Sequence, residues 1–406
     1  MRMLILFLVL LMPITGCSTR SHENPLDPEN KTTEGNPQWL TAVAQNESVA
    51  LSWSVPAFRD VSEFVLRDLV TEDILFRGES GSGNFLHAPL PNGLTQSYRL
   101  ELKLTDGTEQ LFPEVLAEPG PAVPWVLDSA SGQVLQLAPD ARAVAFALDV
   151  RDPISIRTDP ADGSLLVADF FRGRVSYYTS GGELVWENET LPRPRAILVE
   201  SNRFWVADPV ENRVVELDRG GAVVGASDSL DIPLLLSQGP GESIWVAEQT
   251  GRLYQVSPAD RSPQFIVEGF ESPVAMAPRP NGGVWLADAL LEQILKVDPD
   301  GTVAQIFPNL PAIASLTPDP VVTDGVWISD RTNNTVSLLD GNGTVLQSLP
   351  GLAAPSRVSL SPDGSEIWVA DPGLRSVLRF ARNGTLISEY DRLTSPIIID
   401  LAFPTP

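Results

Sequence analysis

Trp205-Val206-Ala207-Asp208 is one copy of a four-residue kernel that occurs seven times in this 406-residue chain and decides its fold. Each copy has an aromatic or aliphatic residue, a β-branched residue or Leu, a small or apolar residue, and then an acid. The kernel acids are Asp128, Asp169, Asp208, Glu248, Asp288, Asp330 and Asp371. Successive acids are 39 to 42 residues apart, and six of the nine Trp occupy the first kernel position. A period of this length predicts an array of similar supersecondary units.

The residues around each kernel predict four antiparallel strands per unit. An apolar strand that often begins with Pro, such as residues 355–358, precedes the kernel and is followed by a turn such as Asp363-Gly364. A further strand begins five or six residues after the acid, and a second tight turn such as Asn342-Gly343 follows it. Four strands per repeat is the pattern of a β-propeller blade.

The two ends of the repeat region predict how the array closes. The first kernel, at Trp125, has no room for an inner strand before it, whereas residues 396–401 form a spare strand at the C-terminus. We expect this strand to complete the first blade and to close a ring of seven blades, which leaves no open sheet edges. The predicted propeller covers residues 121–406. Its repeat resembles NHL and streptogramin-lyase-like seven-bladed propellers, a likeness that implies architecture and leaves activity open.

A second, smaller domain is predicted over residues 38–118. Residues 49–56, 64–67 and 98–102 are short strands with alternating patterns, and Trp53 is expected to point inward. Tyr98 occupies the place of a tyrosine corner. These features resemble a fibronectin type III domain. The predicted fold class is therefore all-β: a small fibronectin type III-like β-sandwich plus a seven-bladed β-propeller closed by the C-terminal strand.

The N-terminal residues predict a compartment. The apolar run 4–12 is too short for a permanent membrane helix and is typical of a signal peptide, here residues 1–16. Ile14-Thr15-Gly16-Cys17 resembles a bacterial lipobox, which implies that Cys17 becomes a lipidated N-terminus and a membrane anchor. The alternative is an ordinary secretory signal that leaves an incidental free Cys. Residues 17–37 are polar and predict a flexible tether. We expect a bacterial cell-envelope lipoprotein, anchored in the outer membrane and facing either the periplasm or the surface.

Composition narrows the chemistry that the chain can perform. A formal net charge of -24 argues against a nucleic-acid partner, and a single Cys excludes an intramolecular disulfide. The only two His, His22 and His87, lie outside the predicted propeller. Streptogramin-lyase-like enzymes are expected to use a His, and amidating-lyase propellers hold zinc through His, so neither mechanism transfers to this repeat. We predict no catalytic residue, metal ligand or cofactor, although calcium or magnesium held by acids at a central channel, as in lactonase-like propellers, stays open.

The repeated residues are interpreted as structural, and deviations from the repeat as candidates for function. Each kernel acid can accept backbone N–H bonds from the loop that it begins, and each kernel Trp can fill the wedge between neighbouring sheets. A rim of Arg is predicted on one propeller face, in the loops after the kernels and before the inner strands. Its members are Arg151, Arg172, Arg174, Arg193, Arg195, Arg213, Arg252, Arg331, Arg357 and Arg375. These Arg residues either pair locally with kernel acids or bind carboxylate or phosphate groups of a ligand.

Three functions are compatible with this pattern. The first is a non-enzymatic, lipid-anchored scaffold whose propeller face binds a protein or polysaccharide. The second is a metal-dependent lactonase- or lyase-like enzyme. The third is an outer-membrane assembly factor, an analogy based on architecture alone.

Overall fold

The computed structural model describes residues 37–56, 61–148, 150, 152–227, 230–310 and 312–404. Cys17, Arg151, the predicted signal peptide and nearly all of the predicted tether lie outside these ranges. The described residues form strands almost throughout, with one short 3-10 helix, η1 (Pro240–Glu242). None of the described segments is a helix that is long and apolar enough to span a bilayer. The prediction of an all-β protein is therefore confirmed.

Contacts between residues divide the chain into two compact units, which are described separately. The larger unit contains Leu116–Pro406 together with the short segments Ala42–Leu51 and Asn84–Ser97.

The strands before residue 118 form two antiparallel sheets. Trp53 and Tyr98 are buried, as the alternating pattern predicted, and the Trp53 ring packs 4.9 Å from the ring of Phe76. One sheet has three strands in the order β1 (Leu40–Gln45), β2 (Ser48–Ser54) and β5 (Ser82–His87). The other has the order β4 (Ile74–Gly78), β3 (Val61–Asp68), β6 (Gln96–Leu104) and β7 (Glu109–Leu111), and β8 (Val115–Ala117) also pairs with β6.

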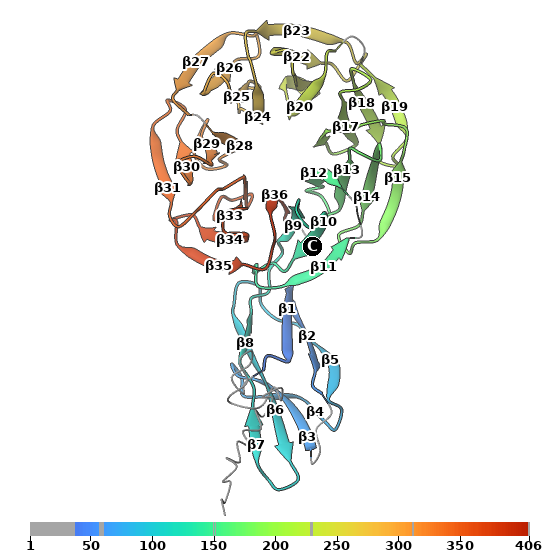
Figure 1. Ribbon diagram of the computed structural model, residues 1–406, viewed down its shortest axis with the longest axis vertical. Coiled ribbons are helices and arrows are strands. Elements are labelled where there is room, and N and C mark those ends of the chain that lie inside the picture. The colour runs from blue at the N-terminus through green and yellow to red at the C-terminus, as the bar shows by residue number, and fades with distance from the viewer. Residues whose placement is uncertain are drawn as a thin grey trace, which may run out of the picture. The chain divides into compact units, whose positions relative to one another are not determined.

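The rest of the described chain folds into seven four-stranded antiparallel sheets arranged around a common centre (Figure 1). The first, written from the centre outward, is β36 (Pro396–Ala402), β9 (Val123–Asp128), β10 (Gln133–Leu137) and β11 (Val144–Leu148). The second to fourth are β12 (Pro153–Thr158), β13 (Leu165–Asp169), β14 (Arg174–Tyr178) and β15 (Leu184–Asn188); β16 (Ala196–Val199), β17 (Arg203–Asp208), β18 (Arg213–Asp218) and β19 (Val223–Ala226); and β20 (Pro233–Gln238), β21 (Ile244–Glu248), β22 (Arg252–Val256) and β23 (Pro263–Glu268). The fifth to seventh are β24 (Pro273–Pro278), β25 (Val284–Asp288), β26 (Gln293–Val297) and β27 (Val303–Pro308); β28 (Ile313–Pro318), β29 (Val326–Asp330), β30 (Thr335–Leu339) and β31 (Val345–Leu349); and β32 (Arg357–Leu360), β33 (Glu366–Asp371), β34 (Ser376–Ala381) and β35 (Leu386–Tyr390).

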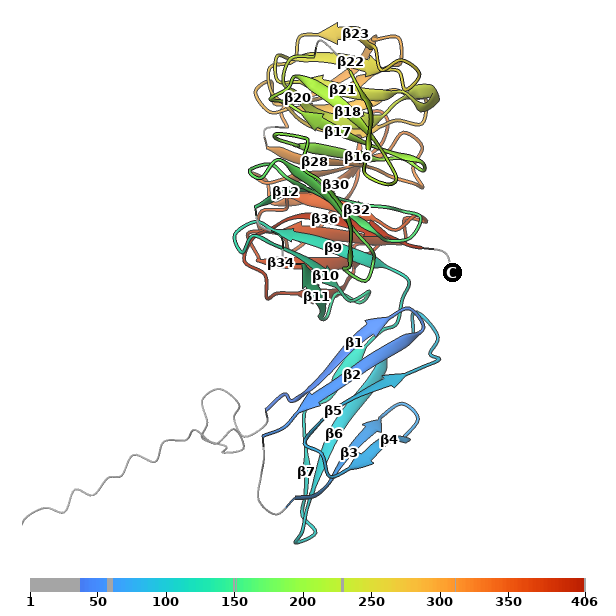
Figure 2. The same ribbon diagram turned by 90° about the vertical axis from the view of Figure 1, so that its right-hand side faces the viewer.

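The C-terminal strand supplies the inner strand of the first sheet. β36 pairs antiparallel with β9, and Ile399 lies opposite Val126. The predicted pairing of the spare strand with the first kernel strand is therefore confirmed. Figure 2 shows that inner strands such as β12 and β36 run along the central axis of this unit.

The first residue of each kernel fills the space between its own sheet and the next one. The six kernel Trp are fully buried, and Leu166 takes their place in the second sheet. Trp125 packs in one cluster with Ile156 of the second sheet, and Trp368 packs in another with Ile399 of the first. Hydrophobic clusters of the same kind join every other neighbouring pair of sheets. The apolar core of this unit is thus a continuous circle of contacts between sheets, which is the packing of a propeller-type fold.

Ion pairs add further links between neighbouring sheets, mostly through hairpin turns at the end of the sheets opposite the kernel acids. They join side chains about forty-five to sixty residues apart in sequence. The pairs are Asp159 with Arg219, Glu216 with Arg261 at 2.7 Å, Arg279 with Asp324 at 2.9 Å, and Asp319 with Arg382 at 2.9 Å. These four Arg residues are therefore used in structural pairs between sheets.

Candidate functional site

Two kinds of loop meet at one end of the seven sheets. In five of the seven sheets the first residue of the inner strand lies opposite a kernel acid, as Pro273 lies opposite Asp288 and Pro396 opposite Asp128. The loop that leads into the inner strand and the loop that follows the kernel are therefore neighbours. We call the end of the sheets that carries these loops the kernel face.

The kernel acids are buried and hold these loops to the sheets. Asp371 accepts four backbone N–H bonds of 2.8 to 3.1 Å, from Ala353 and Ala354 before the inner strand and from Gly373 and Leu374 after the kernel. Asp288 accepts four in the same arrangement. Among the described residues, no group of three or more His, Cys, Asp and Glu is placed to hold a metal ion.

Asp208 differs from Asp288 and Asp371, and the sequence supplies the reason. Its Oδ1 accepts a bond from the Glu211 N–H at 3.4 Å, and its buried Oδ2 has no hydrogen-bond partner among the described residues. Pro192 stands two residues before the strand-leading Pro194, where Ala353 precedes Pro355, and a proline has no N–H to donate. Burial raises the pKa of the Asp208 carboxyl above its usual range.

The raised pKa of Asp208 predicts a pH dependence of stability. Because this carboxyl binds its proton more tightly in the folded chain than in the unfolded one, its ionisation costs folding free energy at neutral pH. We compare the free energy of unfolding of wild type with that of Asp208→Asn. We expect the value for wild type minus the value for the variant to rise as the pH falls from 7 through the raised pKa of Asp208. Urea titrations of both proteins at several pH values measure this difference. A constant difference between them over that range would contradict the prediction.

The predicted Arg rim separates into paired and unpaired members. Arg172 and Arg174 lie 3.8 and 3.4 Å from Asp169, Arg213 lies 3.8 Å from Asp208, and Arg252 lies 3.5 Å from Glu268. Within the described ranges, four exposed members have no salt bridge: Arg193, Arg195, Arg331 and Arg375.

Arg357 is not in the loop where the sequence predicted it. It is the first residue of β32 and lies opposite Ala370 in the sheet, because the preceding Ser356 N–H already bonds to the Ala370 carbonyl at 2.9 Å. The inner strand therefore begins at Arg357 and carries this side chain away from the loops. Arg357 is only partly exposed, and its Nε atom is buried without a hydrogen-bond partner among the described residues.

One pocket on the kernel face combines unpaired Arg with aromatic and apolar side chains. It has a volume of about 430 Å³ and lies over the second, third and fourth sheets. Phe171 is 73% exposed, and Arg193 stands over the neighbouring Phe170 ring at 5.3 Å from its centroid, a cation–π geometry. The lining residues are Ile154, Ser155, Arg157, Phe170, Phe171, Arg195, Ala196, Leu234 and Leu235. Such a lining suits a ligand with an anionic group next to an apolar or aromatic part.

Sequence reasoning missed Phe170, Phe171 and Arg157, although a signal for the two Phe was present. The second repeat is the only one in which two aromatic residues follow the kernel acid. A solvent-facing loop has no packing need for such a pair, and exposed aromatic residues are typical of binding sites.

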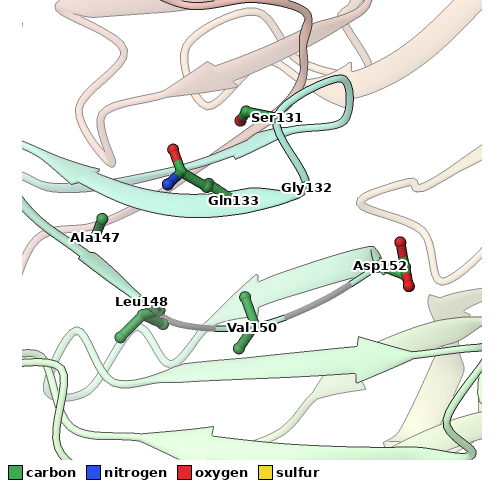
Figure 3. Close-up of a pocket in the computed structure, with 7 residues that line it drawn as sticks. All are labelled: Ser131, Gly132, Gln133, Ala147, Leu148, Val150 and Asp152. Atoms are coloured by element: carbon green, nitrogen blue, oxygen red, sulfur yellow. The ribbon is translucent and has the colours of Figure 1, made fainter.

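A second hollow lies beside the outer part of the first sheet, with a volume of about 400 Å³ (Figure 3). Its side chains come from the loop before β10, from the end of β11 and from the segment before β12. They are Ser131, Gly132, Gln133, Ala147, Leu148, Val150 and Asp152. This hollow has one charged side chain and no aromatic one, so the pocket at Phe171 is the stronger candidate.

The comparisons with known proteins support the fold and leave the activity open. No family model matches the sequence, and no curated protein is similar to it in sequence. Virginiamycin B lyase from Staphylococcus aureus is similar in structure, with a TM-score of 0.51, 16% identity, and coverage of 59% of this chain and 84% of that one. AztD from Citrobacter koseri has a TM-score of 0.54, 14% identity, and coverage of 69% and 97%. A Bacteroides fragilis protein whose name proposes a 6-phosphogluconolactonase has a TM-score of 0.54, 14% identity, and coverage of 69% and 98%. At these identities the likeness shows a propeller-type fold alone.

Proposed function

We propose that this protein is a lipid-anchored binding scaffold of the bacterial cell envelope, whose kernel face engages a protein or glycan partner. In this proposal Cys17 carries the lipid, residues 17–37 are the tether, and residues 38–118 form a fibronectin type III-like spacer. Residues 121–406 form a seven-bladed propeller closed by β36. An outer-membrane anchor fits the lipobox-like segment and the Ser that follows Cys17.

The observation that carries the proposal is the pocket around Phe171. Exposed Phe171, its partly buried neighbour Phe170 and two Arg without carboxylate partners lie together on the face where the loops meet. Aromatic residues and Arg are the side chains that contribute most to binding energy in protein interfaces. Acidic groups of a protein or polysaccharide would match the Arg, and apolar or sugar-ring surfaces would match the Phe.

Crosslinking in cells tests the proposal with a matched control. A photoreactive residue replaces Phe171 in the full-length protein, and in a second strain it replaces Leu290, which is also exposed and stands two residues after its own kernel acid. We expect a discrete crosslinked partner from position 171 and none from position 290, and Arg195→Gln should weaken the product at 171. Equal labelling at both positions, or no product at either, would contradict a binding role for this face.

The alternative enzyme has a different signature. A metal-dependent lactonase- or lyase-like propeller is expected to gain thermal stability in calcium or magnesium, because a bound ion stabilises the folded state by mass action. Turnover of a lactone or another ester by the purified protein, in a metal-dependent way, would replace the scaffold proposal. An outer-membrane assembly factor would instead be identified by the nature of the crosslinked partner.

A further inference from the structure

The innermost strands carry a charge cluster that the repeat does not require. The sheet registers place one inner-strand residue of each sheet opposite the first kernel residue. In sheet order these residues are Asp400, Arg157, Leu198, Ser237, Ala277, Thr317 and Ser359. Only Asp400 and Arg157 are charged, and they belong to neighbouring sheets. Five uncharged residues at the equivalent position show that folding of the sheet needs no ion there.

Arg357 is a second charged exception among the inner strands. It stands two residues before Ser359, at the position opposite the third kernel residue. The residues opposite the third kernel residue are otherwise small or apolar: Ile398, Ser155, Ala196, Leu235, Ala275 and Ser315. Arg357 replaces them in β32, and β32, β36 and β12 are the inner strands of three consecutive sheets. Ser356 Oγ bonds to the Ile397 carbonyl at 3.0 Å, which ties the start of β32 to β36. Three charged side chains therefore lie on three adjacent inner strands.

This cluster contains two positive groups and one negative group, and its hydrogen bonds do not pair them with one another. Asp400 Oδ2 already accepts bonds from the Thr158 N–H at 2.7 Å and the Thr158 hydroxyl at 3.0 Å. Arg157 Nη1 donates to the Ile156 carbonyl of its own strand at 3.2 Å. Neither Arg157 nor Arg357 has a salt bridge among the described residues, and Arg357 Nε is buried without a partner. No salt bridge among the described residues thus joins either guanidinium group to Asp400, whose Oδ2 already accepts two hydrogen bonds from Thr158.

Two unpaired guanidinium groups in this position are unfavourable unless a further anion pairs with them. Burial, and then the charge of Arg157, lowers the pKa of Arg357 to about 9, so the group is still protonated at pH 7. A partly buried cation without a counter-ion loses some of its hydration and gains no ion pair in return. An oxyanion that accepts bonds from both guanidinium groups would remove this cost, because carboxylate and phosphate match the planar donor fork of Arg.

We propose that the inner strands β32, β36 and β12 form an oxyanion site, in which Arg357 and Arg157 bind the carboxylate or phosphate group of an amphipathic ligand. Arg157 also lines the pocket at Phe171, so the apolar part of the same ligand would lie against Leu234, Leu235 and Phe171. The inference rests on the proposed binding function of the kernel face, because it names the ligand chemistry of that site.

Calorimetric titration with three eight-carbon probes tests the site: octanoate, octyl phosphate and octanol. We expect octanoate, octyl phosphate or both to bind wild type, and octanol to bind much more weakly. The tighter of the two anions identifies the headgroup. Arg357→Met should reduce anion affinity at least about ten-fold, the equivalent of losing one charge-assisted hydrogen bond. Arg392→Met, which removes an exposed Arg that is not a member of the predicted rim, should leave the affinity unchanged.

Thermal unfolding without probe separates a ligand site from a structural role. Removal of an unpaired, partly buried cation should leave the melting temperature of Arg357→Met equal to or above that of wild type, whereas loss of a structural group would lower it. If Arg357→Met fails to fold, the structural role is correct and the inference is wrong; Arg157→Met then tests Arg157 separately. Octanol binding as tightly as the anions, or undiminished anion binding by Arg357→Met, also overturns it.

The two proposals can fail independently. If a partner is crosslinked at position 171 and neither anion binds, the oxyanion site is wrong and the scaffold proposal stands. If anion binding depends on Arg357 and no partner is crosslinked, the oxyanion site is supported and the scaffold proposal is wrong.

Discussion

Removal of β36 is expected to abolish cooperative folding of the larger unit. A chain that ends at Ser395 loses every hydrogen bond between β36 and β9, together with the buried Ile399 that packs against Trp368. Loss of a buried Ile side chain alone costs about 2 to 5 kcal/mol, against a total stability of about 5 to 15 kcal/mol for a typical domain. The open edge of β9 would also favour aggregation. Thermal unfolding followed by circular dichroism should show no cooperative transition.

Two controls tie this effect to the strand itself. A chain that ends at Pro404 keeps β36 and should unfold like wild type. A synthetic peptide of residues 396–404, added during refolding of the shortened chain, should restore part of the transition by pairing with β9. A shortened chain that melts within a few degrees of wild type would show that the first and last sheets hold together without the strand.

The fold could be predicted in large part because its signals are local and repeated. The kernel places a Trp or Leu and an acid at fixed positions, and the turn dipeptides mark the ends of the strands, so seven similar sheets follow from one pattern. The absence of an inner strand before Trp125 and the spare strand at residue 396 together predicted the pairing of β36 with β9. Burial of the Trp followed from the same repetition.

The candidate site could be predicted only in part because it depends on contacts between sheets. Several Arg residues form pairs that no local pattern reveals, as Arg279 does with Asp324, forty-five residues away. Arg157 looks like any Arg near the end of a strand until the structure joins its neighbour Thr158 to Asp400 on the adjacent inner strand. Arg357 was counted with the loop Arg residues although residues 355–358 were predicted to be a strand, and in the structure it is the first residue of β32.

Asp371→Asn is expected to destabilise the larger unit far more than the same substitution at Asp208. The Asp371 carboxylate accepts four backbone N–H bonds, and an Asn amide group would turn an N–H donor toward some of those donors. Hydrogen bonds to a charged group contribute about 1.5 to 3 kcal/mol each, so loss of two predicts a decrease of about 3 to 5 kcal/mol in the free energy of unfolding. Urea titration at pH 7 measures this decrease.

Asp208→Asn is the matched control, because it changes the same kernel position in another sheet. Asp208 accepts one long bond at 3.4 Å, its Oδ2 lacks a hydrogen-bond partner among the described residues, and burial raises its pKa. Neutralising this carboxyl removes a desolvated charge and few bonds, so we expect a change of at most about 1 kcal/mol in either direction. Equal losses at the two positions would mean that the negative charge of the kernel acids stabilises the sheets. A large loss at Asp371 alone would mean that the acids stabilise the sheets by accepting the backbone N–H bonds of the loops.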